Sequence, residues 1–284
     1  MTILEALRQG QEFLARKQAE TPFLDAVLLL GEAAQLSKER IFAGFTDPLE
    51  PLQYARFQSL LMDRASGIPI AYLRGRKEFL SLEFHVHPGV FIPRPATETL
   101  VAAALEQARA KAAERGAGKI TVHDACTGTG CVAIAVQHEM PSLEVSCSDV
   151  SEAALDTCRR NVRRLLGDVI PCLRSDLLTE VAGRFDLITA NPPYLTEAAV
   201  DSMNGRGWPE PDTALRGGAD GLDLCGRLIR QAHEKLERRG VLLMEADPQQ
   251  MRRLESAMRG EGYSFIRILK DMGGHQRVIC GSVA

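Results

Sequence analysis

The sequence predicts an α/β fold, in which a doubly wound, mainly parallel sheet is preceded by a small bundle of helices. Strand and helix signals alternate in the second part of the chain, with strand-like segments at 119–125, 143–149, 185–190 and 240–246. Such alternation is typical of βαβ units, whose parallel strands present ligand sites at their carboxyl ends. A glycine-containing turn follows the first of these strands. We therefore expect a ligand site at that edge of the sheet.

In residues 1–70 the spacing of the apolar side chains differs from this pattern. Apolar side chains recur there every three or four positions, as at Ile3, Leu7 and Leu14, which indicates amphipathic helices. Proline-containing breaks divide the segment into roughly three or four helices. Residues 1–70 are therefore expected to form a helical bundle.

A segment of different character, residues 71–95, joins the bundle to the α/β part. Strand-like stretches lie at 70–73 and 82–86, and each is followed by a turn residue, Gly75 or Gly89. We predict a connecting β-hairpin here. The remaining residues, 96–284, are assigned to the α/β domain.

Charge and hydropathy exclude several classes of protein. The net charge of -3 and the pI near 6.1 provide no general attraction to a phosphate backbone, which disfavours nucleic acid as a direct substrate. The first ten residues carry Glu5 and Arg8, and no run of apolar residues is long enough to cross a membrane. We therefore expect a cytoplasmic protein without a membrane partner.

The seven cysteines are odd in number and scattered, without a C-x-x-C pair. This pattern favours buried thiols over a zinc site or a redox motif. His85 and His87 alternate on an expected strand, but no third ligand stands at a suitable spacing. The sequence therefore predicts no metal site.

A five-residue turn follows the strand at 119–125 and precedes a helical run. Glycine lets the backbone pass close to a ligand, and a helix N-terminus offers N–H donors. The glycine spacing does not match G-x-G-x-x-G, so the turn alone is weak evidence. Asp149 ends the next strand, where an acidic residue accepts hydrogen bonds from ribose hydroxyls. We predict a cofactor pocket formed by Asp149 and the turn residues Cys126, Thr127, Gly128, Thr129 and Gly130.

Each acidic residue near this turn has a structural alternative. Asp149 is either a ribose ligand or a helix cap, although Ser151 is placed to do the capping instead. Asp176, after the expected third strand, is either a cofactor contact or a plain loop carboxylate. Asp124, before the turn, either braces the loop or meets an ammonium group of the cofactor.

The tetrapeptide Asn191-Pro192-Pro193-Tyr194 follows the strand at 185–190, at the same edge as the glycine turn. Two prolines end the strand and fix the backbone, so that the Asn191 side chain and the Pro192 carbonyl can point into a pocket. Two neighbouring acceptors suit a target with a planar NH₂ group. The ring of Tyr194 would lie over that group and attract a positively charged sulfonium methyl. A rigid turn without function is the alternative interpretation.

Together these residues resemble the class I (Rossmann-like) methyltransferases with an N-P-P-Y loop, and specifically the release factor glutamine methyltransferases. The resemblance spans nearly the whole chain, including the helical N-terminal bundle. Its landmarks occur in the family's order, at 67–72, 78–79, 91–95, 126–131, 191–194, 210–211 and 220–223.

The resemblance implies an enzyme that uses S-adenosylmethionine to methylate the glutamine amide in the Gly-Gly-Gln motif of peptide chain release factors, which its bundle binds. It implies that residues 126–130 wrap the methionine part of the cofactor, that Asp149 holds the ribose and that Asp176 and Leu177 hold the adenine. It further implies that the glutamine amide is held by Asn191, Pro192, Pro193 and Tyr194, with Asn191 also next to the cofactor.

Two positions depart from the family's pattern. Cys126 stands where the family usually has Gly, and Ala96 stands where it usually has Glu. Cys126 adds a Cβ where the backbone approaches the cofactor, so we expect weaker binding or a shifted turn. Ala96 removes a carboxylate that would position the loop, and Glu98 is the expected replacement.

The mechanism that these residues suggest is an in-line displacement at the sulfonium methyl, driven by alignment of the two reactants. The amide nitrogen is a poor nucleophile, so acceptors at Asn191 and Pro192 must favour the form in which positive charge grows on it. The sequence shows no obvious general base, and no metal is required.

Three other functions compete with the release factor resemblance, because each could involve an N-P-P-Y loop. An adenine-N6 nucleic-acid methyltransferase also presents a planar NH₂ to such a loop, but it needs a basic groove and a target-recognition domain. A cofactor-binding module without activity conflicts with the intact Asn191. A glutamine methyltransferase acting on another protein, such as a ribosomal protein, would share the same chemistry.

Overall fold

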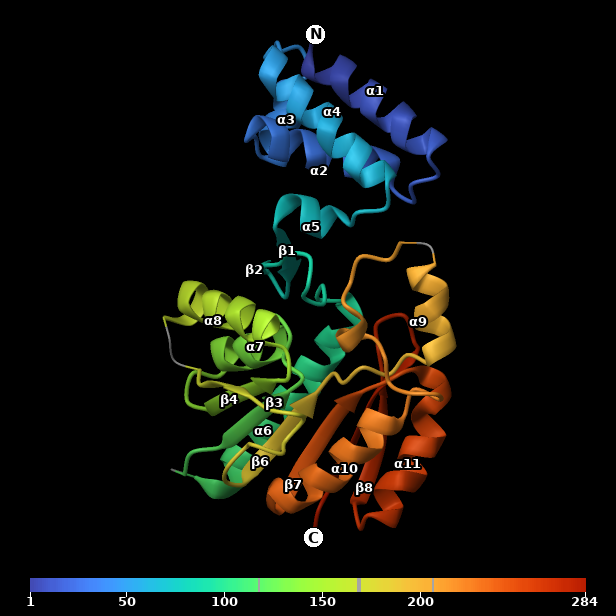
Figure 1. Cartoon of the computed structure of the whole chain (residues 1–284). Helices are drawn as coiled ribbons and strands as arrows, with labels where there is room; N and C mark the ends of the chain where they lie inside the picture. Colours follow the sequence, from blue (N-terminus) through green and yellow to red (C-terminus); the bar gives the residue numbers. More distant parts are fainter. Residues whose placement is uncertain (117, 168–169, 206) are drawn as a thin grey trace. The chain divides into compact units, whose positions relative to one another are not determined.

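The computed structural model describes residues 1–116, 118–167, 170–205 and 207–284. The chain divides into two compact units (Figure 1). The first comprises residues 1–76 with a short piece around 207–209, and the second comprises Lys77–Gly205 and Glu210–Ala284. No helix among the residues just given is long and apolar enough to span a membrane.

The first unit is a helical bundle, as the apolar spacing predicts. Two of its helices begin at side-chain caps: the Thr2 side chain accepts from the backbone of Glu5, and Ser37 caps the third helix in the same way. Phe57 fills the centre, and a Cβ on Gly10 would lie 2.6 Å from its ring. The helices are α1 (Ile3–Arg16), α2 (Pro22–Ala34), α3 (Lys38–Ala43), α4 (Pro51–Ala65) and α5 (Ile70–Arg74).

The last of these helices corrects a prediction. Residues 70–73 were expected to be strand-like, but they form α5, which ends at Gly75 in the left-handed conformation. Four apolar residues are too few for their periodicity to distinguish a strand from one helical turn, and the glycine cap decides for the helix. The expected hairpin is present further along, as β1 (Arg76–Phe79) and β2 (Leu82–His85).

The second unit is built on a seven-stranded sheet in the order β5-β4-β3-β6-β7-β9-β8. The strands from β5 to β7 run parallel, whereas β9 is antiparallel to both of its neighbours. The final antiparallel pair has no counterpart among the predicted strands. The bounds are β3 (Thr121–Ala125), β4 (Glu144–Asp149), β5 (Cys172–Arg174), β6 (Phe185–Ala190), β7 (Leu236–Glu245), β8 (Ser264–Lys270) and β9 (Gln276–Ser282).

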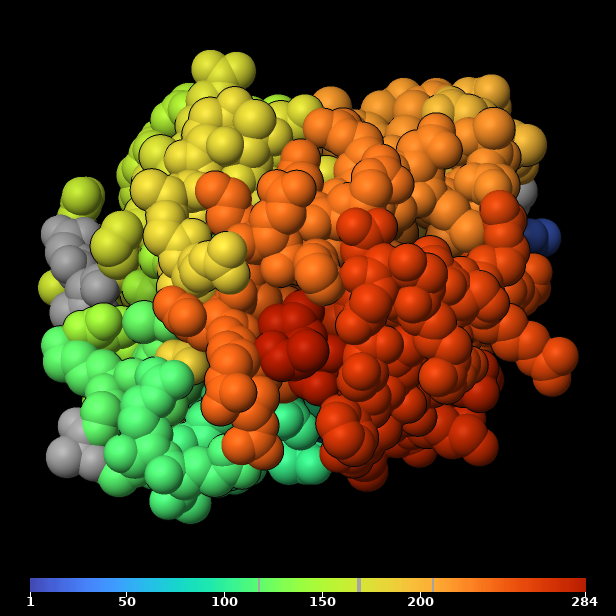
Figure 2. Space-filling view, turned by 90° about the horizontal axis from the view of Figure 1, so that it is seen from below, coloured from blue at the N-terminus to red at the C-terminus, as the bar shows by residue number. Residues whose placement is uncertain are grey.

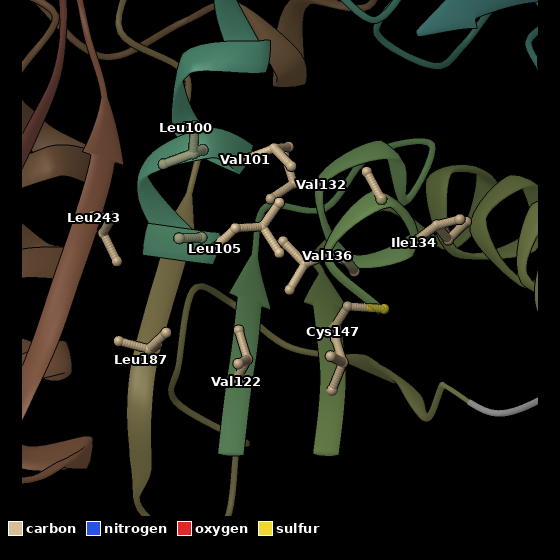
Figure 3. Packing of buried hydrophobic residues seen from close by; sticks show 14 of the residues in the cluster. Leu100, Val101, Leu105, Val122, Val132, Ile134, Val136, Cys147, Leu187 and Leu243 are labelled. Atoms are coloured by element: carbon tan, nitrogen blue, oxygen red, sulfur yellow. The ribbon is translucent and has the colours of Figure 1, made fainter. Parts of the chain in front are cut away.

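Helices cover both faces of this sheet, so that neighbouring residues of one strand enter different cores. Leu187 of β6 packs with the core under α6, α7 and α8 (Figure 3), while Ile188 packs with the core under α10 and α11. Further along the chain, α9 precedes a loop that leads to α10. The bounds are α6 (Glu98–Arg115), α7 (Cys131–Glu139), α8 (Glu152–Leu166), α9 (Glu197–Asn204), α10 (Asp223–Lys235) and α11 (Met251–Gly260).

The end of the chain is tied into the sheet. Ser282 of β9 pairs with Val241 of β7 on one side and with Ser264 of β8 on the other. In Figure 2 the darkest red residues accordingly lie between orange and lighter red segments. The chain crosses from β7 through α11 to the edge strand β8, and β9 then inserts between these two strands, antiparallel to both.

Strand order places the switch point of the sheet between β3 and β6. From β3 the chain proceeds to β4 and β5 on one side and then returns to β6 on the other side. Crevices at the carboxyl ends of strands that flank such a point bind ligands in open α/β sheets. The glycine turn follows β3 and the N-P-P-Y loop follows β6, with Ala125 and Ala190 in register immediately before them.

Candidate cofactor and substrate site

A cavity of about 300 Å³ opens at this switch point within the second unit, at the lower end of the range of about 300–1,000 Å³ common for small-molecule sites. Its wall combines the glycine turn, the end of β4, the loop after β5 and the N-P-P-Y loop. Of the residues predicted for the site, all except Gly130 line it: Cys126, Thr127, Gly128, Thr129, Asp149, Asp176, Leu177, Asn191, Pro192, Pro193 and Tyr194.

The glycine turn depends on left-handed backbone at three positions. Gly128 and Gly130 have φ of 57° and 80°, and Cys126 has φ of 55°. Glycine adopts this region freely, but a residue with a Cβ is strained there. A Cβ on Gly130 would also lie 2.6 Å from the sulfur of Cys158 in α8. The strain at Cys126 is therefore the structural consequence of its departure from the family's glycine.

Asp124 is a brace for two loops. Its carboxylate accepts hydrogen bonds from the hydroxyls of Thr127 at 2.6 Å and Thr189 at 2.7 Å. Burial raises the pKa of Asp124 from 3.8 to about 6, although both hydroxyls act in the opposite direction. Of its two predicted roles, the geometry favours bracing, because these bonds tie the glycine turn to the last residues of β6.

Asp149 ends β4 beside the glycine turn. One carboxylate oxygen accepts from the Gly128 N–H at 2.9 Å and the other from the Ser151 N–H at 3.0 Å. Ser151 itself caps α8, through a bond from the Ala154 N–H. Burial raises the pKa of Asp149. The helix therefore has its own cap, and Asp149 is a lining residue of the cavity.

Asp176 and Leu177 form the far wall. Asp176 pairs with Arg227 at 2.5 Å and is half exposed, while Leu177 is buried and has φ of 55°. The left-handed backbone turns the Leu177 side chain into the core that contains Ile188. The carboxylate of Asp176 thus has a structural partner, while Leu177 ties this loop to the core.

The Asn191 side chain is oriented by a neighbouring hydroxyl. Its amide nitrogen donates to the hydroxyl of Thr97 at 3.5 Å. Because the nitrogen end of the amide is engaged, the oxygen end is left as an acceptor. Thr97 belongs to the turn Pro95–Thr97 that opens α6, so a segment far away in the sequence determines this orientation.

Two glycines support the backbone of the N-P-P-Y loop. A Cβ on Gly217 would lie 2.7 Å from the Pro193 carbonyl oxygen, and a Cβ on Gly221 would lie 2.2 Å from the Tyr194 carbonyl oxygen. Gln250 donates to that same Tyr194 oxygen at 2.8 Å. The family landmark at 220–223 therefore corresponds to a close approach that only glycine permits.

A buried carboxyl lies behind the ring of Tyr194. The Tyr194 hydroxyl donates to Oε1 of Glu245 at 3.3 Å, while Oε2 of Glu245 is buried and has no hydrogen-bond partner within the described part of the chain. Burial raises the pKa of Glu245 and, together with Glu245, that of Tyr194. Both groups are therefore neutral over a wider pH range than in water.

The segment 91–95 is fixed by Glu210. One carboxylate oxygen of Glu210 accepts from the Ile92 N–H at 2.8 Å, and the other pairs with Arg94. Arg94 also lies over the ring of Phe91, at 4.8 Å from its centre. Two landmarks more than a hundred residues apart thus form one wall, in which Glu210 holds the segment 91–95. The replacement role expected of Glu98 stays a prediction.

Comparisons with known proteins agree with this arrangement. The family model described as the PrmC N-terminal domain matches residues 5–75, and the model described as the methyltransferase small domain matches residues 81–206. The release factor glutamine methyltransferase of Moorella thermoacetica is 36% identical over 98% of this chain and 97% of its own length. That of Rhodopirellula baltica is 34% identical over 98% and 95%. The chain belongs to the release factor glutamine methyltransferase family.

A solved structure supports the fold of this family member. The T. thermophilus 16S rRNA N2 G1207 methyltransferase, determined in complex with AdoMet and guanosine, superimposes with a TM-score of 0.51 at 20% identity, covering 74% of this chain and 50% of that chain. The predicted class I methyltransferase fold is confirmed, and the chain is a methyltransferase.

Sequence reasoning missed several residues that shape the site of this methyltransferase. Thr97, Glu210 and Glu245 are not among the residues that the sequence predicts for the site. Thr97 stands two residues after the Pro-Arg-Pro landmark, and Glu210 belongs to a Glu-Pro landmark. Closeness to these landmarks is the signal that the sequence offers for Thr97 and Glu210. Their contacts join distant segments of the chain, and no spacing rule reveals such contacts.

Proposed function

We propose that the chain transfers a methyl group from S-adenosylmethionine to the N5 amide nitrogen of the glutamine in the Gly-Gly-Gln motif of peptide chain release factors. The observation that carries this proposal is the convergence of the glycine turn and the N-P-P-Y loop on one cavity. Family membership supports the choice of a release factor as substrate.

The residues around the turn suit S-adenosylmethionine. A Cβ on Gly128 would meet no protein atom within 4 Å, so the backbone there borders open space. We assign residues 126–130 to the methionine part, Asp149 to the ribose hydroxyls, and Asp176 with Leu177 to the adenine. When bound, S-adenosylmethionine supplies an electrophilic methyl group on a positively charged sulfur.

The N-P-P-Y loop is assigned to the substrate glutamine. The side-chain oxygen of Asn191 and the carbonyl oxygen of Pro192 accept the two hydrogens of the amide. Accepting both hydrogens stabilises positive charge that develops on the nitrogen, and it aligns the nitrogen for reaction. Pro193 keeps this backbone rigid, and the Tyr194 ring provides a surface that attracts positive charge.

Release factor binding is assigned to the bundle at residues 1–70, which the PrmC N-terminal domain model covers from residue 5. The net charge of -3 favours a protein over a nucleic acid as the large substrate. The cytoplasmic location predicted from the sequence is part of this proposal.

A labelling experiment tests the substrate. The purified protein is incubated with S-adenosylmethionine labelled in its methyl group and with one of three acceptors: release factor, release factor in which the motif glutamine is changed to alanine, or DNA. Label is expected only on the unmodified release factor. Label on DNA, or equal label on the alanine-substituted factor, would refute the assignment.

A further inference from the structure

Three cysteine thiols that lie far apart in the sequence meet beside the sheet. Cys147 lies on β4, Cys158 on α8 and Cys172 on the edge strand β5. Their sulfur atoms are separated by 3.5 Å for Cys147 and Cys172 and by 3.6 Å for each of the other two pairs. Within the described ranges, no other group of three His, Cys, Asp or Glu side chains is close enough to share a metal ion.

The size of this triangle matches a metal site. Metal–thiolate bonds of about 2.3 Å separate the sulfur atoms by about 3.8 Å at tetrahedral angles and by about 4.0 Å in a trigonal plane. These separations are about 0.2–0.5 Å larger than the observed sides. A disulfide would require an S–S distance of about 2.05 Å, which is about 1.5 Å shorter than the observed separations. The thiols are therefore better placed to share an ion than to pair with each other.

The type of ligand selects the type of ion. All three donors are sulfur, and soft thiolates favour Cu(I) and Zn(II) over harder cations. Structural zinc is almost always four-coordinate, whereas this group supplies three protein ligands. A three-coordinate arrangement suits Cu(I).

The surroundings of the three sulfur atoms would protect a bound ion, which could enter beside Cys172. Cys147 and Cys158 are completely buried in the apolar core under α7 and α8, where Figure 3 shows Cys147. Cys172 is only partly buried and lies on the edge strand. Hydrogen bonds with Cys158 and Cys172, and then burial, raise the pKa of the Cys147 thiol. A metal ion binds the thiolate form of cysteine, so binding releases thiol protons to solvent.

This cluster is separate from the methyl-transfer cavity. None of the three cysteines lines that cavity, although Cys126 and Cys131 do. Cys158 nevertheless touches the floor of the glycine turn, since its sulfur occupies the space beside Gly130.

We propose that Cys147, Cys158 and Cys172 form a binding site for one thiophilic metal ion, with Cu(I) as the preferred ion. The proposal is independent of the release factor chemistry, because it concerns residues that the cavity does not use.

The test is an anaerobic titration of the reduced full-length protein with Cu(I) held by a coloured chelator. One equivalent of Cu(I) is expected to transfer to the protein, with thiolate-to-metal absorption in the near ultraviolet and three sulfur neighbours by X-ray absorption. Zn(II), titrated in parallel, is expected to bind more weakly; tighter binding of Zn(II) would overturn the preference for Cu(I).

Cys158→Ala is expected to weaken Cu(I) binding by about a hundredfold or more, since even groups that only orient metal ligands contribute about ten- to a hundredfold. Cys280→Ala, which removes a buried thiol of β9 outside the cluster, is the matched control and should bind normally. Because Cys158 is completely buried, Cys172→Ser at the more accessible position is measured as well, with circular dichroism to verify folding. No stoichiometric uptake, or uptake that survives both substitutions within the cluster, would overturn the proposal.

Discussion

The two loops at the cavity lie at the same edge of the sheet but differ in their backbone: one needs conformational freedom and the other needs stiffness. The turn after β3 depends on backbone freedom, with left-handed residues at Cys126, Gly128 and Gly130. The loop after β6 depends on stiffness: it contains two prolines, and the carbonyl groups of Pro193 and Tyr194 lie close to Gly217 and Gly221, respectively. The difference indicates that the first loop adapts its backbone to a ligand, whereas the second projects fixed acceptors. Mutations in the two loops should therefore have separable effects.

The largest effect is expected for Asn191→Ala. Loss of one of the two proposed amide acceptors should lower the turnover of release factor methylation by about a hundredfold or more, as for other groups that stabilise developing charge. Cofactor affinity, measured by calorimetry, should change little. Asn204→Ala at the end of α9 is the control, and unchanged turnover in Asn191→Ala would remove the distinction between the loops.

Gly221→Ala tests whether stiffness of the second loop matters. Its Cβ would meet the Tyr194 carbonyl oxygen at 2.2 Å, and displacing reacting groups by about 1 Å can lower the rate by about a hundredfold. Gly183→Ala is a matched control, because Gly183 also has positive φ but an added Cβ would meet nothing within 4 Å. Both variants should lose about 1–2 kcal/mol of stability from backbone strain, but only Gly221→Ala should lose turnover. Equal turnover in the two variants would show that the loop tolerates displacement.

Asp124 joins the two loops, and its ionisation gives a pH test of that link. Its pKa is raised on folding, from 3.8 to about 6, so its stabilising contribution is present below about pH 4 and is lost as the pH rises through about 6. The shift corresponds to about 2–3 kcal/mol. In urea unfolding, the stability of the natural chain relative to Asp124→Asn should fall by that amount between about pH 4 and pH 6. The exposed Asp156→Asn is the control, and a parallel pH dependence of the natural chain and Asp124→Asn would contradict the link.

The smallest effect is expected for Cys126→Gly in the glycine turn. Glycine removes left-handed strain of about 1–2 kcal/mol but also increases the entropy of the unfolded chain, so stability should change little. S-adenosylmethionine should bind several times more tightly, as judged by calorimetry. Cys126→Ala keeps the Cβ and should show no gain. An equal gain in both variants would assign the effect to the sulfur and not to the backbone.

Local patterns predicted the parts of the fold that depend on neighbouring residues. The alternation of strands and helices placed the turn at 126–130 and the loop at 191–194 on one edge, because parallel strands all end there. The short helix Ile70–Arg74 was misread, since a single helical turn has no measurable period. The β8–β9 pair was not predicted.

Contacts between distant segments were beyond prediction from one sequence. Glu210 meets Ile92 and Arg94 across more than a hundred residues, and the cluster of Cys147, Cys158 and Cys172 depends on the pairing of β4 with β5 and on the packing of α8. No spacing rule encodes either arrangement, because each depends on the complete fold.

The most direct test of the proposed function is mass spectrometry of release factor after incubation with the protein and S-adenosylmethionine. The peptide that contains the Gly-Gly-Gln motif should gain the mass of one methyl group, and fragmentation should place it on the glutamine side chain. Asn191→Ala should leave that peptide almost unmodified under the same conditions. A methyl group on another residue, or no methylation by the natural chain, would contradict the assignment of Asn191 and Pro192 to the glutamine amide.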